Sequence, residues 1–216
     1  MSPARNKGGS DKRRLIIEAA VKVFAEKGFF GARVSEIAEA AGVADGTIYL
    51  YFRSKDDLLI SLFEEKMDDI LGGLGRMLAE HARPEDKLRR YIVEHLRLVA
   101  EQPELMQVLT VELRQSARFI KEYTPKAFGR LLDTVGNILE EGQQAGVFHP
   151  SLDIAVFRRA LFGAIDEISL EWVLRSRSGG AEPERQDSPP VLSDPVKVGN
   201  EIADFILRGL KVNFVS

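Results

Sequence analysis

The chain has 216 residues, enough for one large domain or two small ones, and its 44% hydrophobic and 29% charged composition suits a globular protein with a buried core. It contains no cysteine, which excludes disulfides, thiolate zinc sites, iron–sulfur clusters and a cysteine nucleophile. Its apolar runs are much shorter than the roughly 20 residues of a membrane helix, and no secretory h-region follows the basic N-terminus. We therefore expect a cytoplasmic protein that does not bind membranes.

Charge is unevenly distributed along the chain. Residues 1–55 contain ten Lys and Arg against six Asp and Glu, whereas the other residues contain 20 against 27. The front of the chain is therefore suited to a polyanionic partner and the rest is not.

The first elements are expected to be helical. Residues 1–9 are polar and rich in Gly and Ser, which predicts a disordered tail. From Asp11 the apolar residues recur every three or four positions, so a helix is expected to about Gly28. Two short helices follow at about 34–41 and 45–51, separated by Gly42.

The remaining elements are also predicted to be helices, so the fold class is all-α. Ser54, with Asp57 three residues later, predicts the start of a long helix. Prolines, which fit the first position of a helix, open most of the helices that follow. These are expected at about 84–101, 103–117, 124–145, 151–175 and 195–212, with a mobile low-complexity loop at 176–194.

The most informative segment is 34–55, VSEIAEAAGVADGTIYLYFRSK, which has the layout of a helix-turn-helix. Small and apolar residues of the two helices are expected to pack together across a sharp turn at Gly42: Ile37, Ala38 and Ala41 on Val43, Ile48 and Phe52. The free N–H groups at the start of the second helix are a natural phosphate contact. Cations flank this segment at Lys12, Arg13, Arg14, Arg33 and Lys55.

Residues 11–58 resemble the DNA-binding region of TetR-family transcriptional repressors. The most specific part is the run G-T-I-Y-x-Y-F-x-S-K-x-x-L at 46–58. The resemblance implies a three-helix helix-turn-helix DNA-binding domain at 10–55. It also implies a helical ligand-binding and dimerisation domain at 56–216.

The same resemblance assigns candidate DNA contacts. Thr47, Tyr49 and Tyr51 lie where family members touch DNA, Lys55 where they hold a phosphate, and Gly46 where the backbones approach closely. Two adjacent choices stay open: Arg33, Val34 or Ser35 contacts the DNA backbone, and Asp45 either accepts from a cytosine amino group or caps the helix. The candidate DNA-binding residues are Arg33, Ser35, Asp45, Gly46, Thr47, Tyr49, Tyr51 and Lys55.

Residues 84–175 resemble a subgroup of that family, the acyl-CoA-sensing regulators of fatty-acid degradation (the FadR or YsiA-like group). The resemblance depends mainly on ELRQSARFIKEYTPKAFGRLL (112–132) and FGAIDEISLEWVL (162–174). It implies a ligand cavity between helices, and the candidate ligand-binding residues are Leu109, Leu113, Arg114, Arg118, Phe128, Leu131, Leu132, Val135, Phe162 and Asp166. Arg114 and Arg118, at i,i+4, form either a cationic rim for ligand phosphates or a solvated charged face.

Together these features predict a homodimeric repressor, not an enzyme, that binds a palindromic double-stranded DNA operator. The resemblance implies dimerisation through the helices at 151–175 and 195–212, the second with an apolar stripe at Val198, Ile202, Phe205, Ile206 and Leu210. The expected effector is a long-chain fatty acyl-CoA, with no resident cofactor and no metal. The alternatives are another apolar effector, such as a drug or a free fatty acid, and a helical lipid-binding protein that does not bind DNA.

Overall fold

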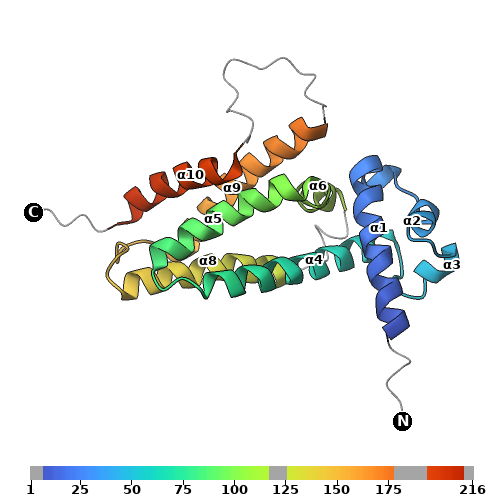
Figure 1. Ribbon diagram of the computed structural model, residues 1–216, viewed down its shortest axis with the longest axis horizontal. Helices are drawn as coiled ribbons and strands as arrows, with labels where there is room; N and C mark the ends of the chain where they lie inside the picture. Colours follow the sequence, from blue (N-terminus) through green and yellow to red (C-terminus); the bar gives the residue numbers. More distant parts are fainter. Residues whose placement is uncertain (1–6, 117–125, 178–193, 212–216) are drawn as a thin grey trace, which may run out of the picture. The chain divides into compact units, whose positions relative to one another are not determined.

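The computed structural model describes residues 7–116, 126–177 and 194–211 (Figure 1). Within those ranges the structure is helical and contains no β-strand, only an isolated bridge between Phe148 and Lys211. The all-α prediction is confirmed. In chain order the elements are α1 (Lys7–Gly31), α2 (Val34–Ala40), α3 (Asp45–Ile48), α4 (Lys55–Leu78), α5 (Pro84–Glu101), α6 (Pro103–Thr110), the 3₁₀ turn η1 (Glu112–Gln115), α8 (Lys126–Gln144), α9 (Ile154–Arg177) and α10 (Pro195–Leu210).

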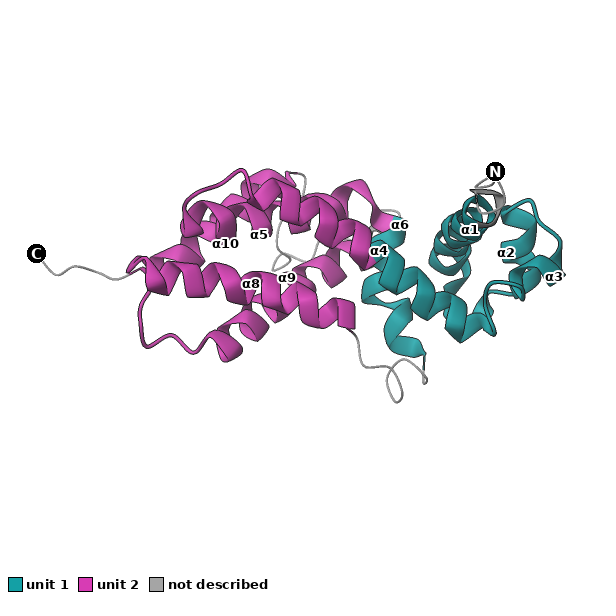
Figure 2. Ribbon diagram, turned by 90° about the horizontal axis from the view of Figure 1, so that it is seen from below, with its two compact units in different colours: residues 1–66, 104–124 teal, residues 67–103, 125–216 magenta. Residues whose placement is uncertain are grey.

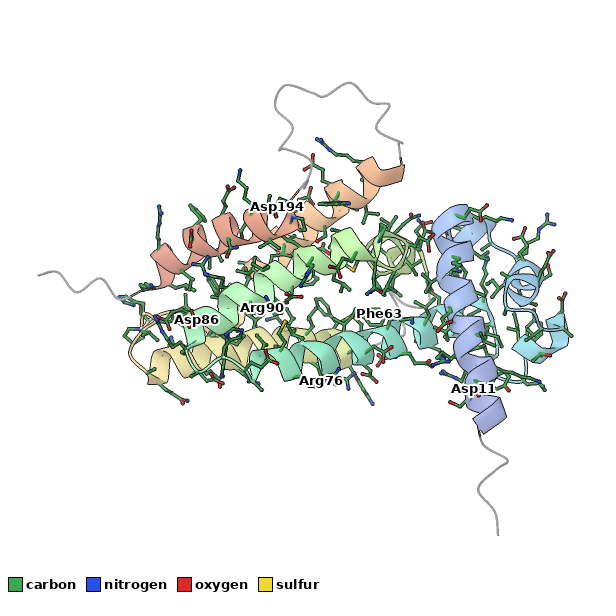
Figure 3. All side chains as sticks on the ribbon, viewed as in Figure 1. Asp11, Phe63, Arg76, Asp86, Arg90 and Asp194 are labelled. Atoms are coloured by element: carbon green, nitrogen blue, oxygen red, sulfur yellow. The ribbon has the colours of Figure 1, made fainter. Side chains whose placement is uncertain are left out.

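Side-chain caps start two helices where the sequence predicts them. At α4 the Asp57 N–H donates to Ser54 Oγ at 3.1 Å, and the Arg53 N–H donates to Asp57 Oδ2 at 2.7 Å. Ser54 is therefore the side-chain cap of α4, and the Asp57 carboxylate binds the N–H of the residue before that cap. At α10 the Lys197 N–H donates to Asp194 Oδ1 at 2.9 Å, and Figure 3 shows Asp194 at the start of that helix.

Two boundaries near the N-terminus differ from the prediction. α1 begins at Lys7, so residues 7–9 are helical rather than part of a tail, because a nucleated helix gains one backbone hydrogen bond for each added residue. α3 ends at Ile48 instead of Tyr51. The Leu50 and Tyr51 N–H groups donate to carbonyls only three residues earlier, at 3.2 and 3.0 Å, so a tighter turn replaces the last helical turn.

Two boundaries later in the chain also differ. The predicted helix 103–117 breaks at Val111, whose φ of −107° and ψ of −60° separate α6 from the 3₁₀ turn. α9 begins at Ile154 because Asp153 Oδ1 accepts from the Val156 N–H at 3.1 Å and caps the helix there. The first two residues of the predicted helix 124–145 and most of the predicted loop at 176–194 lie outside the described residues.

The chain divides into two compact units, which differ from the predicted domains (Figure 2). Unit 1 comprises residues 1–66 and 104–124, and unit 2 comprises residues 67–103 and 125–216. The segment that contains α6 and η1 thus packs with the N-terminal helices, although it lies far along the chain. The functional boundary between residues 55 and 56 stays a prediction.

Within unit 2, α10 packs on α5 through a buried face made of Gly199, Ala203, Leu207 and Leu210. A Cβ on Gly199 would lie 2.8 Å from the Val93 Cα, so the two helices can approach this closely only with glycine there. None of the helices in the described part of the chain has both the length and the apolar character needed to cross a membrane.

Candidate nucleic-acid interface and effector region

The core of the predicted helix-turn-helix is present in unit 1. Ile37 and Ala38 of α2, Ile48 of α3 and Phe52 are all buried, as the pattern predicts. Ala41 and Val43, which were expected in the same contact, are only partly buried. The two helices therefore pack against each other through these buried side chains and leave their other faces to solvent.

The turn between α2 and α3 is a Schellman motif. Gly42 has a φ of +66°, its N–H donates to Glu39 O at 3.0 Å, and the Val43 N–H donates to Ala38 O at 3.0 Å. Glycine adopts this left-handed conformation without a steric penalty. The predicted role of Gly42 is confirmed.

An exposed edge follows α3. Tyr49 is 59% exposed and Leu50 is 80% exposed, whereas Tyr51 is partly buried with its ring 6.4 Å from that of Phe52. Residues two positions apart cannot share one helix face, so the sequence predicts that at least one of the two tyrosines is exposed, and this prediction is confirmed. Sequence reasoning missed Leu50, yet a signal was present: Ile48 and Phe52 are i,i+4 core residues, so Leu50 between them points the other way. An exposed apolar side chain here can contact a thymine methyl group.

The start of α3 presents backbone to solvent. A Cβ on Gly46 would meet nothing within 4 Å, so no contact in the described part of this chain requires glycine there. The N-cap is Ala44, with no side-chain cap, so the interpretation of Asp45 as the cap is wrong. Asp45 is instead the first residue of the helix, because the Thr47 N–H bonds to the Ala44 carbonyl at 2.8 Å.

Two other candidates lie at the start of α2, where Arg33 is the N-cap and Ser35 follows, both exposed. The Arg33 N–H donates to Glu36 Oε2 at 2.9 Å, and Lys27 Nζ donates to Glu36 Oε1 at 2.7 Å. Both bonds lower the pKa of Glu36, and the bond from Lys27 has the larger effect. Both Arg33 and Ser35 stay candidates for the contact to the DNA backbone.

Lys55 is already engaged inside unit 1. Its ammonium donates to Ala32 O at 3.0 Å and Phe30 O at 3.3 Å and lies 4.7 Å from the centre of the Phe29 ring. An ammonium has three donors, and the two carbonyls use two of them. Lys55 therefore holds the link between α1 and α2, in addition to its predicted contact with a phosphate.

The candidate ligand-binding residues fall into both units. In unit 1, Leu113 is buried, Leu109 is partly buried and Arg114 is exposed. In unit 2, the Phe128 and Phe162 rings meet edge to face, with their centroids 4.8 Å apart. The remaining candidates lie on the same two helices, α8 and α9. Leu131, Leu132 and Val135 on α8 are buried, and Asp166 on α9 is partly buried.

The predicted cationic pair on one helix face is not confirmed. Arg114 lies in the 3₁₀ turn, where residues at i and i+4 do not share a face, and donates to Thr110 O at 2.8 Å. Arg118 lies outside the described residues. Arg130, another cation of this region, forms an ion pair with Asp68.

A polar pair, partly buried His95 and buried Ser169, lies between α5 and α9. His95 Nε2 is 3.1 Å from Ser169 Oγ, and that hydroxyl donates to Ile165 O at 2.8 Å, so the imidazole donates to Ser169. Burial lowers the pKa of His95 to about 4, although the charge of Asp166 opposes this shift. His95 is therefore a neutral structural group, and the described residues hold no group of three potential metal ligands.

Two family models together match most of the chain. Residues 16–62 match the model of bacterial regulatory proteins of the tetR family, and residues 63–178 match the C-terminal region of YsiA-like protein. The fatty acid metabolism regulator protein of Bacillus subtilis is 41% identical over 199 residues, which are 92% of this chain and 95% of that protein.

Solved structures give the same result. FadR of Bacillus subtilis, crystallised with stearoyl-CoA, is 36% identical with a TM-score of 0.79, over 91% of this chain and 98% of that one. The fatty acid degradation regulator FadR of Bacillus halodurans is 35% identical with a TM-score of 0.80, over 92% and 95% of the two chains. The similarity thus covers both the helix-turn-helix and the helices that follow it.

Proposed function

The chain belongs to the TetR family of bacterial regulatory proteins, and on that premise we propose that it is a homodimeric repressor released from a palindromic operator by a long-chain fatty acyl-CoA. The observation that carries the proposal is the exposed edge after α3, with Tyr49 and Leu50 projecting beside the bare backbone of Gly46. An apolar and aromatic edge of this kind suits the bases of a major groove. The positive net charge of residues 1–55 supports the approach to DNA.

The exposed faces of α9 and α10 support the dimer. The buried face of α10 packs on α5, yet a second apolar face remains open, with Phe205 81% exposed and Ile202 and Ile206 partly buried. On α9, Val156 and Leu174 are also exposed. Apolar faces on neighbouring helices at the end of the chain fit a two-fold bundle with a second copy. Two heads would then read half-sites about 34–36 Å apart.

The expected effector follows from the relatives. FadR of Bacillus subtilis, which is similar to this chain over 91% of its length, binds stearoyl-CoA in its crystal structure. The apolar residues on α8 and α9, including the Phe128 and Phe162 ring pair, suit an acyl chain. Ligand releases DNA only if it binds the released arrangement more tightly, and a preference of about 100-fold corresponds to roughly 2.7 kcal/mol of coupling.

Replacing Gly46 with alanine tests the DNA interface. A Cβ at this position meets no atom of the described chain, so unfolding stability should not fall, and it should rise slightly as the unfolded chain loses freedom. If the backbone approaches a phosphate here, operator affinity should fall by about tenfold or more, since one lost charge-assisted contact is worth about 1.5–3 kcal/mol. Fluorescence anisotropy with labelled operator measures this affinity.

The matched control is Gly75→Ala in α4, another exposed helical glycine without neighbours. It should leave operator affinity unchanged. If Gly46→Ala binds the operator as tightly as the wild type does, α3 does not approach DNA at its first turn.

Replacing Lys55 with alanine separates its two roles. Loss of the bonds to Ala32 and Phe30 should lower the unfolding free energy by about 1–2 kcal/mol. If its third N–H holds a phosphate, the slope of log affinity against log salt should also become shallower by about one for each head, equally for all DNA sequences. Lys87→Ala is the control, because Lys87 is a cation of unit 2 that pairs with Glu141, and this variant should leave the slope unchanged. A slope equal to that of the wild type would leave Lys55 with only its structural role.

A further inference from the structure

The last turn of α1 is interrupted at Gly28. This residue has a φ of 73° and a ψ of 162°, which are not helical values. In a regular helix the Phe29 N–H would donate to the Ala25 carbonyl, four residues earlier. The kink turns the Phe29 N–H away from the helix axis and leaves both groups in need of other partners.

Two side chains from the segment that contains α6 and η1 take the two ends of this opened bond. Gln107 Nε2 donates to Ala25 O at 2.6 Å, and Glu112 Oε2 accepts from the Phe29 N–H at 2.7 Å. Gln107 is 6% exposed and Glu112 is 1% exposed, so the two contacts are shielded from water. A Cβ on Gly28 would lie 3.4 Å from Glu112 Oε2, so glycine leaves room for the carboxylate as well as adopting the positive φ.

A third contact joins the same segment to the start of α4. The fully buried Ser116 donates from Oγ to Asp56 Oδ1 at 2.6 Å. The neighbour of Asp56 is Lys55, which binds the carbonyls of Phe30 and Ala32. The link between α1 and α2 is therefore held by α4 at one end and by Glu112 at the other.

We propose that Gln107, Glu112 and Ser116, which we call the kink clamp, are positioning residues that transmit effector binding to the DNA-binding helices. Along the chain the clamp lies between α5 and α8, inside the region that matches the YsiA-like C-terminal model, yet it packs in unit 1. A displacement of 107–116 on ligand binding would move the end of α1 and the start of α4 together, because polar side chains bind both. The inference rests on the proposed function and names the contacts through which that function is regulated.

Replacing Glu112 or Gln107 with methionine tests the clamp, because methionine has a similar length and cannot form either bond. Glu112→Gln is the conservative variant, since its amide oxygen can still accept from the Phe29 N–H. Gln143→Met is the matched control, because Gln143 also donates to backbone carbonyls, His149 O at 3.0 Å and Leu152 O at 3.1 Å, but in unit 2. The measured quantity is the ratio of operator Kd with and without saturating stearoyl-CoA, on a palindrome selected by the wild-type protein.

The wild-type ratio should be in the range of about 5–150 that is typical of allosteric coupling. In Glu112→Met and Gln107→Met it should fall at least about fivefold toward one, whereas Glu112→Gln and Gln143→Met should stay within about twofold of the wild type. Amide hydrogen exchange at Phe29 should accelerate in Glu112→Met. A group that served only stability would weaken folding and leave the ratio unchanged.

Folded methionine variants with the wild-type ratio would overturn the inference, and so would an equal fall in Gln143→Met. If Glu112→Met does not fold, Gln107→Met and Ser116→Ala decide by the same ratio. If the wild type binds its palindrome but does not respond to stearoyl-CoA, the proposed effector is wrong and the inference fails with it. If the wild type responds normally and the clamp variants respond equally, the inference alone fails.

Discussion

Replacing Phe205 with glutamate should separate the proposed dimer into monomers and abolish tight operator binding. Phe205 is 81% exposed on the open face of α10, so in a dimer its ring would be buried against the second copy. Loss of a central aromatic anchor costs about 2–4 kcal/mol of binding free energy, and an unpaired buried carboxylate adds to that cost. With only one head per molecule, operator affinity should fall by at least about 100-fold, since bivalent binding gains roughly 10²–10⁴ over a single contact.

Sedimentation velocity gives the molecular mass directly, and circular dichroism should show an unchanged fold because the side chain is on the surface. Leu15→Glu is the matched control for mass, since Leu15 is an exposed apolar residue of α1, on the N-terminal unit. It should leave the dimer intact. A Phe205→Glu protein that remains dimeric would show that the open face of α10 is not the interface.

Lowering the pH from 7 to 5 should destabilise the protein by about 2 kcal/mol through His95 alone. The pKa of His95 in the folded state is about 4, below the ordinary value of 6.5. Between those values the unfolded chain binds a proton that the folded chain does not bind. The contribution of His95 to the unfolding free energy is therefore fully present above pH 6.5 and is lost as the pH falls toward 4.

Urea unfolding of wild type and His95→Gln at the two pH values measures this contribution at a fixed protein concentration. Glutamine retains a donor for Ser169 and has no ionisable group, so the pH dependence of the variant should be smaller by about 2 kcal/mol. His149→Gln, at an exposed histidine outside the α5–α9 contact, is the control and should behave as the wild type does. An equal pH dependence in His95→Gln would contradict an imidazole that stays neutral in the folded protein.

Local signals in the sequence predict much of the fold and part of the interface. The Ser54 cap, the stop at Gly42 and the Asp194 cap each depend on residues within a few positions, so the sequence is sufficient to find them. The exposure of at least one of Tyr49 and Tyr51 follows in the same way, because residues two positions apart cannot share one helix face.

The interactions that the sequence does not predict join distant segments. Periodicity places 103–117 on one helix and gives no sign that Val111 breaks it, because the break allows Glu112 to reach Phe29 across 83 positions. Lys55 has a partner in the carbonyl of Phe30, 25 positions earlier, a contact that depends on how α1 ends. Such contacts are set by tertiary packing, which overrides local propensity.

Titration of the operator complex with stearoyl-CoA tests the central claim most directly. Labelled operator is held with the protein at a concentration that binds most of the DNA, and anisotropy follows its release. We predict release by stearoyl-CoA, little effect of coenzyme A, and little effect of stearate, because the effector needs both its acyl chain and its phosphates. Operator that stays bound at saturating stearoyl-CoA would contradict the account, and release by stearate alone would assign the regulator to a free fatty acid.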